Sequence, residues 1–185
     1  MDLTPDLSRE INYRPIGIIR SPFTRAEDAP IQPRYAAAAE GRAEIRPEFE
    51  AGLADLEGFS HIILIYHLHQ AGPARLRVKP FLQDAERGVF ATRAPCRPNP
   101  IGLSVVELIR REGDVLHLRG VDVLDGTPLL DIKPYVSRFD CWRTTRDGWQ
   151  DEVDEATAAA RGRRAAGAPA ARTAGPGQPP GRESR

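Results

Sequence analysis

The sequence predicts an all-β protein: a compact antiparallel β-barrel with little helix and a disordered C-terminal tail. Short apolar segments follow one another with turn residues between them, and helices do not regularly separate them. No Gly-x-Gly-x-x-Gly motif follows a strand, which argues against a Rossmann nucleotide-binding domain. Pro95, Pro98 and Pro100 fall within six residues and exclude a helix from one polar segment.

The predicted elements follow from apolar periodicity and turn residues. Residues 1–12 are expected to be a flexible lead-in and residues 13–153 the barrel domain. A helix is expected at 47–56, because its apolar residues have helical spacing and Gly58 would end it. The expected strands are 13–19, 42–45, 62–68, 75–81, 102–109, 115–123 and 129–136, with a hairpin turn at 112–114. The strand at 62–68 is almost continuously apolar, which predicts burial on both of its faces.

The tail differs from the domain in composition. Residues 154–185 are rich in Ala, Pro, Gly and Arg and poor in large apolar residues, so they cannot bury a core and are expected to be disordered. Their six arginines are able to contact RNA loosely.

Charge and cysteine content restrict the class of protein. The formal net charge is zero, which excludes a generally basic nucleic-acid-binding surface but leaves room for a local basic groove. Cys96 and Cys141 form no Cys-x-x-Cys pair, so a zinc ribbon or a disulfide scaffold is not expected. With no long apolar run and no signal-peptide pattern, we expect a soluble cytoplasmic protein that does not enter a membrane.

The segment 88–104 is the strongest candidate for a binding site. Its prolines make it stiff and extended, which holds Arg93, Arg97 and Asn99 in a nearly preset arrangement. Arginine makes forked contacts to carboxylate or phosphate groups, and a rigid backbone lowers the entropic cost of binding. The alternative is a proline-rich structural crossover whose arginines are only solvated.

Two histidines and one turn are further candidate sites. His67 and His69 are expected on one face of the strand at 62–68, but no third ligand lies near them, so a metal site is not expected. The turn 125–128 offers a glycine, a hydroxyl and carboxylates, and Asp122 and Asp131 bracket it. Such carboxylates are able to bind ribose hydroxyls, although an ordinary hairpin end would have the same sequence.

One strand carries a suggestive polar face. Asp131, Lys133 and Tyr135 alternate along the last predicted strand and therefore share one face. An acid, an ammonium and a phenol on one face suit catalysis, whereas a salt-bridged surface face is the alternative.

Four motifs together resemble the TrmO family, also named YaeB, VirR or TsaA-like. They are Ile-Gly-Ile-Ile-Arg-Ser-Pro (16–22), Gly-Phe-Ser-His (58–61), Arg-Ala-Pro-Cys-Arg-Pro-Asn-Pro-Ile-Gly-Leu-Ser (93–104) and Asp-Gly-Thr-Pro-Leu-Leu-Asp-Ile-Lys-Pro-Tyr (125–135). They occur in the family's order, and the resemblance covers roughly residues 13–140.

The resemblance implies a homodimeric β-barrel tRNA methyltransferase that uses S-adenosylmethionine, bound near the dimer interface, and no metal. It implies methylation of N6 of threonylcarbamoyladenosine at position 37, in the anticodon loop of tRNA. The cofactor-binding residues that it implies are Pro30, Ile31, Gln32, His69, Gln70, Arg93, Leu103, Asp125, Gly126, Thr127 and Pro128. Ile31 replaces an arginine that is frequent in the family, and the tail stands where some bacterial members carry a further domain.

The chemistry of the implied reaction suggests roles for the remaining polar residues. Transfer of a methyl group from sulfur to nitrogen depends on alignment, and a group that accepts the nitrogen's proton would help. Asp131 is the expected acceptor, with Lys133 and Tyr135 positioning it. We expect Arg93 to bind the cofactor, and Arg97 with Asn99 to bind substrate in a different neighbourhood. The alternative function is a non-catalytic β-barrel that senses S-adenosylmethionine or binds RNA.

Overall fold

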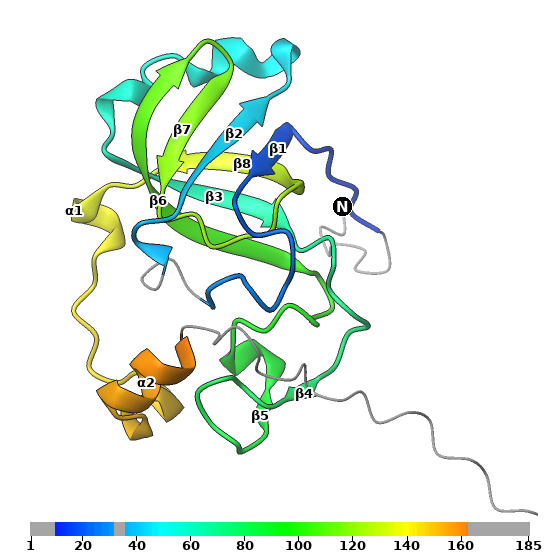
Figure 1. Ribbon diagram of the computed structural model, residues 1–185, viewed down its shortest axis with the longest axis vertical. Helices are drawn as coiled ribbons and strands as arrows, with labels where there is room; N and C mark the ends of the chain where they lie inside the picture. The colour runs from blue at the N-terminus through cyan, green and yellow to red at the C-terminus, as the bar shows by residue number, and fades with distance from the viewer. Residues whose placement is uncertain (1–9, 32–35, 163–185) are drawn as a thin grey trace, which may run out of the picture.

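The computed structural model of this chain describes residues 10–31 and 36–162, and six of its strands form a closed antiparallel barrel. The strands are β1 Gly17–Arg20, β2 Glu40–Ile45, β3 His61–His67, β6 Ile101–Glu112, β7 Val115–Arg119 and β8 Thr127–Pro134. Around the barrel they follow the order β1-β2-β7-β6-β3-β8 (Figure 1). The predicted all-β antiparallel barrel is therefore confirmed.

The barrel has one buried face and one outer face, as strand β3 illustrates. Ile62, Leu64 and Tyr66 point into the core and are nearly inaccessible, whereas Ile63 and Ile65 are only half-buried. The prediction that this strand is buried on both faces is wrong, because a barrel strand turns alternate residues to the core and to the outside. The other strands add the rest of the core, chiefly Ile19, Ala43, Ile45, Val106, Leu108, Leu116, Leu118 and Leu129.

The segment between β2 and β3 closes one end of the barrel. The predicted helix at 47–56 is a pair of 3-10 helices, η2 Pro47–Leu53 and η3 Leu56–Gly58. Asp55 separates them with a positive φ of 66°, a left-handed conformation that interrupts any α-helix. Phe49 and Leu53 still pack against the core, so the apolar spacing is correct although the helix type is not.

A second part of the molecule lies beside the barrel, below it in Figure 1. It contains the two-stranded sheet of β4 Arg77–Val78 and β5 Arg87–Gly88, the 3-10 helices η4 Val89–Ala91 and η5 Gly148–Glu152, and helix α2 Glu155–Gly162. The indole nitrogen Nε1 of Trp149 donates a hydrogen bond of 2.7 Å to the carbonyl oxygen of Ala91. Arg87 and Glu152 form an ion pair at 3.2 Å, so η5 is held against the small sheet.

Several predicted boundaries change. The strand expected at 75–81 is reduced to β4, the strand at 13–19 begins at Gly17, and the strand at 115–123 ends at Arg119. The prediction that disorder begins at residue 154 is wrong for 155–162, which form α2; residues 141–154, including η5, connect this helix to helix α1 Ser137–Asp140. Residues 163–185 of the expected tail, and 1–9 of the expected lead-in, lie outside the described residues.

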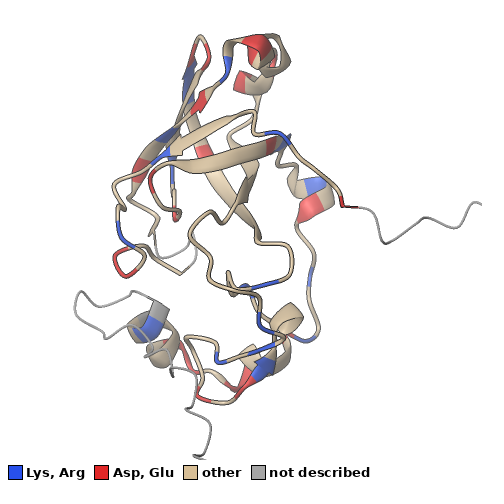
Figure 2. Ribbon diagram, turned by 90° about the vertical axis from the view of Figure 1, so that its right-hand side faces the viewer, with Lys and Arg blue, Asp and Glu red and all other residues tan. Residues whose placement is uncertain are grey.

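Charged residues of both signs are interspersed over the described ribbon (Figure 2). Many of the arginines lie beside a carboxylate, for example Arg111 beside Glu57 at 3.1 Å and Arg119 beside Glu107 at 3.0 Å. Within the described residues, no helix has the length and apolar character required to cross a membrane.

Candidate functional site

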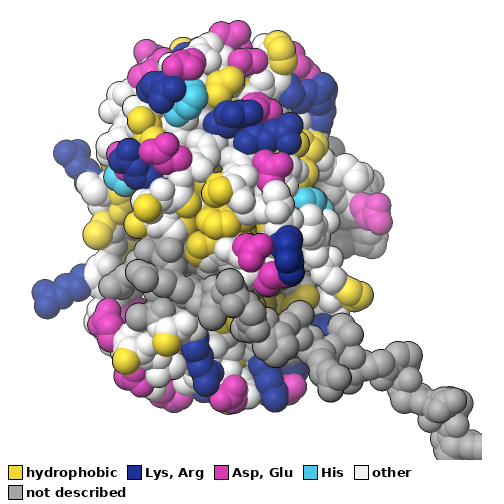
Figure 3. All heavy atoms as spheres, viewed as in Figure 1, with side chains coloured by type: hydrophobic (Ala, Val, Ile, Leu, Met, Phe, Trp, Pro, Cys, Tyr) yellow, Lys and Arg dark blue, Asp and Glu magenta, His cyan; other side chains and the backbone are white. Residues whose placement is uncertain are grey.

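A cavity of about 850 Å³ lies at one end of the barrel. Six separate segments form its walls: the loop after β1, the end of β3 with the turn that follows, residues 79–82 after β4, the proline-rich segment with the start of β6, the connection from β7 to the start of β8, and η5. On the face seen in Figure 3, apolar side chains gather between the barrel and the part below it. A cavity of this size is within the range of small-molecule sites.

Seven residues of the expected cofactor site line this cavity. They are Pro30, Ile31, His69, Gln70, Arg93, Leu103 and Thr127. Gln32 lies outside the described residues. Pairing of β3 with β6 and β8 brings these positions together, since Tyr66 lies opposite both Gly102 and Leu129.

Asp125, Gly126 and Pro128 do not line the cavity; this turn instead anchors the loop after β1. Asp125 accepts a hydrogen bond from the backbone nitrogen of Ser21 at 3.2 Å, and its carboxylate lies 3.7 Å from Arg20. Gly126 has a φ of 77°, which favours glycine, and its nitrogen donates to the carbonyl oxygen of Ile19. These contacts give the turn a structural role next to the cavity.

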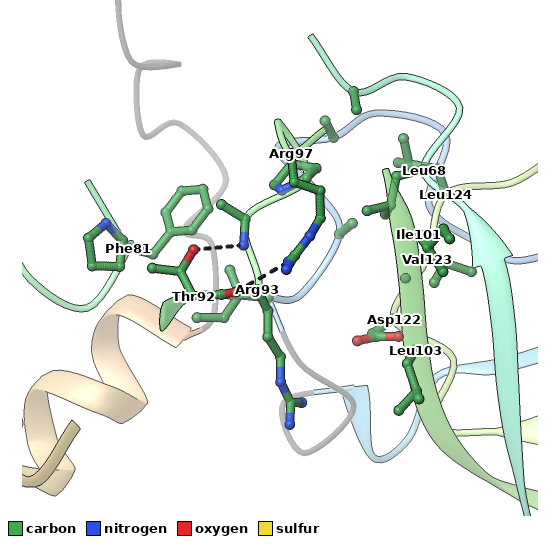
Figure 4. Close-up of a pocket in the computed structure, with 18 of the residues that line it drawn as sticks. Leu68, Phe81, Thr92, Arg93, Arg97, Ile101, Leu103, Asp122, Val123 and Leu124 are labelled. Carbon is green, nitrogen blue, oxygen red and sulfur yellow. Dashed lines mark hydrogen bonds between the residues drawn. The ribbon is translucent and has the colours of Figure 1, made fainter. Parts of the chain in front are cut away.

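The proline-rich segment has neither helix nor strand from Thr92 to Pro100, as its prolines predict. It brings Arg93, Arg97 and Asn99 to the same cavity, so the expectation that Arg97 lies in a different neighbourhood is wrong. The side chains nevertheless differ in direction (Figure 4). Arg97 folds back to donate to the carbonyl oxygen of Thr92 at 3.2 Å and lies 6.0 Å from the ring centre of Phe90, whereas Arg93 points away from it.

His69 lies in the turn after β3 and not on the strand face with His67, so the predicted shared face is wrong. Its Nδ1 is 3.4 Å from the hydroxyl of Thr127, and its Nε2 is 3.4 Å from the amide nitrogen of Gln70. Across residues 10–31 and 36–162, no three His, Cys, Asp or Glu side chains are grouped as a metal site would require.

A buried chain of polar groups, Tyr66, Ser104 and Asp122, ends at the cavity wall; of these residues only Asp122 was considered above, as a carboxylate beside the turn 125–128. The hydroxyls of Tyr66 and Ser104 are 2.9 Å apart, and the Ser104 hydroxyl donates to Oδ1 of Asp122 at 2.6 Å. Tyr66 and Ser104 are 5% and 2% exposed, while Asp122 is half-buried and its carboxylate is directed into the cavity (Figure 4). The signals in the sequence were a tyrosine and a serine on the inward faces of apolar strands, together with an aspartate after a buried valine.

The surroundings of this chain shift two pKa values upward. Burial raises the pKa of Asp122 to about 6, against a smaller opposite effect of the Ser104 hydrogen bond and the Arg93 charge. Burial, together with the Asp122 charge, raises the pKa of the Tyr66 phenol well above its ordinary value. Tyr66 therefore stays protonated at neutral pH and donates to Ser104, which in turn donates to Asp122.

Asp131, Lys133 and Tyr135 are not brought to the cavity. Asp131 and Lys133 form an exposed ion pair at 2.8 Å on β8, and the ring of Tyr135 lies beside that of His61. Asp131 borders a separate hollow of about 340 Å³ next to η2. The salt-bridged surface face, considered above as the alternative, is what the structure contains, and it gives no support to the catalytic roles expected for these residues.

The closed barrel and its end cavity define a small-molecule-binding β-barrel in which arginine, histidine and amide groups border apolar walls. Residues 18–141 match the tRNA-methyltransferase O N-terminal domain, and the chain belongs to this family.

Relatives of the chain carry related names. A protein of Pyrococcus abyssi named "Probable S-adenosyl-L-methionine-binding protein" is 58% identical over 142 residues, covering 77% of each chain. A mouse protein named tRNA (adenine(37)-N6)-methyltransferase is 40% identical over 133 residues, covering 68% of this chain and 31% of its own length. The crystal structure of TrmO from Pseudomonas aeruginosa superposes with a TM-score of 0.64 at 44% identity, covering 76% of this chain and 62% of that one. This chain thus spans about a third of the mouse protein and less than two thirds of the Pseudomonas structure.

Proposed function

We propose that this chain binds S-adenosylmethionine in the end cavity and transfers its methyl group to N6 of adenosine 37 in tRNA. The observation that carries the proposal is the meeting of seven residues, from separate segments of the chain, at a single cavity. The names of the mouse and Pyrococcus relatives support the reaction and the cofactor.

The cavity residues fit the chemical groups of S-adenosylmethionine. Phe81, Ile101 and Leu103 line the cavity and yet are 52%, 40% and 52% exposed, so they offer apolar area that a flat ring would cover. Arg93 supplies a guanidinium for a carboxylate, and His69 with Gln70 supplies hydrogen-bonding groups for hydroxyls or an adenine edge. The site thus combines apolar walls with a few polar groups, as small-molecule sites generally do.

When bound, S-adenosylmethionine supplies a methyl group that an in-line nucleophile displaces from a positively charged sulfur. The contribution of the chain is alignment and exclusion of water. The proline-rich segment holds its arginines with little conformational freedom, and the β3–β6 pairing fixes Leu103 relative to the turn at His69.

Finer features of the function are also proposed. We infer that the substrate is threonylcarbamoyladenosine in the anticodon loop, because its threonyl carboxylate suits the Arg97 guanidinium and the Asn99 amide at the cavity. We further propose that the protein acts as a homodimer in the cytoplasm, where mature tRNA is found. Arg97 and Asn99 then contact substrate within the same cavity that Arg93 shares with the cofactor.

The test is incubation of the protein with labelled S-adenosylmethionine and total tRNA, followed by mass analysis of the nucleosides. We expect one added methyl group on threonylcarbamoyladenosine and none on tRNA that lacks the threonylcarbamoyl group. Methylation of unmodified adenosine 37 would contradict the finer substrate, and tRNA without any label would contradict the function. Arg97→Ala should lower turnover, whereas Arg110→Ala, an exposed arginine paired with Glu112 outside the cavity, should not.

A further inference from the structure

We propose that Asp122 is the catalytic residue that accepts the proton of the substrate nitrogen during methyl transfer. This inference rests on the proposed function and assigns a role that the sequence had given to Asp131. Among the described residues that line the cavity, Asp122 is the one acidic side chain. Asp131, in contrast, is tied to Lys133 on the outside of the barrel.

Other basic groups of the cavity are less suited to this role. Both nitrogens of the His69 ring face a neighbour, the Thr127 hydroxyl and the Gln70 amide. The Tyr66 phenol keeps its proton at neutral pH, because its pKa is raised well above the ordinary value. Asp122 therefore remains as the acceptor that the described part of the cavity offers.

Two buried hydroxyl groups, those of Tyr66 and Ser104, fix the position of the Asp122 carboxylate. Ser104 lies on the buried face of β6 and Tyr66 on that of β3, where a polar group is costly unless it is hydrogen-bonded. The two hydroxyls donate in sequence toward Oδ1 of Asp122, over 2.9 Å and 2.6 Å. A pair of buried hydroxyls thus orients one carboxylate at the wall of the cavity.

The charge environment leaves this carboxylate basic enough to act. The groups that face it are the neutral Tyr66 on β3, the Ser104 hydroxyl on β6 and the positive Arg93 of the proline-rich segment. Burial outweighs the effects of Arg93 and Ser104, so the pKa of Asp122 is raised to about 6. A carboxylate of this kind is ionised at neutral pH and still has appreciable affinity for a proton, as an efficient general base requires.

The reaction balances with no further reagent. A nitrogen attached to the adenine ring is a weak nucleophile, because its lone pair is delocalised into the ring. As it forms the bond to the methyl carbon, the carbon–sulfur bond breaks and the sulfur keeps the bonding pair. The proton of the nitrogen passes to Asp122, which later releases it to water. The positive charge of the sulfonium and the negative charge of the carboxylate thus disappear together, leaving a neutral thioether, the methylated nitrogen and a protonated Asp122.

The decisive experiment compares wild type with Asp122→Asn and with Asp114→Asn, a matched change in the β6–β7 turn outside the cavity. Calorimetry measures S-adenosylmethionine affinity, and single-turnover assays on tRNA measure transfer across pH. We expect Asp122→Asn to bind the cofactor nearly as wild type does and to lose about 100-fold or more in transfer rate. The wild-type rate should fall as the pH drops through about 6, and this dependence should be absent from the residual activity of Asp122→Asn.

The possible failures are distinguishable. Unchanged transfer by Asp122→Asn, or a cofactor affinity reduced as strongly as the rate, would overturn the role of Asp122 while leaving the proposed function intact. A wild-type protein that methylates no tRNA would overturn the proposed function, and this inference with it. Asp122→Glu, which retains a carboxylate, should restore part of the rate; if it is as slow as Asp122→Asn while binding the cofactor normally, the proton-acceptor role is wrong.

Discussion

The Asp122 carboxylate lowers the stability of the fold that holds it. Its pKa is raised from 3.8 to about 6, so the folded state binds this proton more tightly than the unfolded chain does. Stability from this group is therefore present below pH 3.8 and is lost as the pH rises through about 6. Residues kept at such a cost are frequent at functional sites, which agrees with the role proposed for it.

Asp122→Asn should accordingly stabilise the protein at pH 7.5, by at most about 3 kcal/mol, because the amide carries no charge to bury. The advantage over wild type should shrink as the pH falls from 6 toward 3.8. Denaturant unfolding at several pH values measures both effects. A variant that is less stable than wild type at pH 7.5 would show that the ionised carboxylate stabilises the fold.

At the scale of elements, the pairing of β3 with β6 requires a glycine, Gly102, directly opposite the aromatic ring of Tyr66. Gly102 lies opposite Tyr66, and a Cβ added to it would be 2.1 Å from Cε2 of that ring. The ring can occupy this position only while residue 102 has no side chain. The pairing thus places the phenol that begins the hydrogen-bond chain to Asp122.

Gly102→Ala should displace the Tyr66 ring and destabilise the barrel by about 1–3 kcal/mol, as overpacking of a core typically does. It should also lower S-adenosylmethionine affinity, because the ring lines the cavity. Gly88→Ala is the control, since nothing lies within 4 Å of a Cβ at that position. Thermal unfolding compares the two, and equal melting temperatures would disprove the tight packing.

The elements also show which features a sequence reveals. The apolar segments that became β3, β6 and β7 were predicted as strands, but the segment at 62–68 was expected to be buried on both faces, whereas only alternate residues of β3 face the core. The same alternation places Asp131, Lys133 and Tyr135 on one face, but it does not say that this face lies outside the barrel, remote from the cavity. The sequence also did not predict that the helix at 47–56 would be replaced by two 3-10 helices. Asp55, which separates them, adopts a left-handed conformation that aspartate tolerates but that its neighbours in the sequence do not require.

Asp122 and Asp125, in one loop, also show that local sequence does not predict which side chains the fold brings together. Both are aspartates in the connection between β7 and β8, and the glycine after Asp125 makes that position typical of a turn. Closure of the barrel turns Asp125 toward Ser21 and Asp122 toward Ser104. These contacts span 104 and 18 residues along the chain, so local sequence cannot predict them.

At the scale of the whole molecule, the cavity needs both the barrel and the part beside it. Trp149 on η5 lines the cavity and hydrogen-bonds the carbonyl of Ala91, yet it does not belong to the barrel core. Ligand binding and barrel stability should therefore respond differently to changes in η5.

Trp149→Ala should weaken S-adenosylmethionine binding several-fold and change the melting temperature little, because the indole ring is part of the cavity wall and is not part of the barrel core. Trp149→Phe should lose less affinity, since it keeps an aromatic face and loses only the hydrogen bond. Trp142→Ala, at a side chain that is 79% exposed, is the control and should bind as wild type does. Calorimetry and thermal unfolding separate the two effects, and unchanged affinity in Trp149→Ala would place the ligand elsewhere.

The central claim is that the end cavity holds S-adenosylmethionine, and calorimetry of the purified chain with this ligand tests it most directly. We expect binding in the micromolar range in the presence of a chelator, with one ligand per chain. Arg93→Ala should weaken it by about 1–3 kcal/mol, the value of a charge-assisted hydrogen bond, while Arg110→Ala leaves it unchanged. Folded protein that gives neither heat nor a thermal shift with the ligand, or an Arg93→Ala variant that binds as tightly as wild type, would contradict this account.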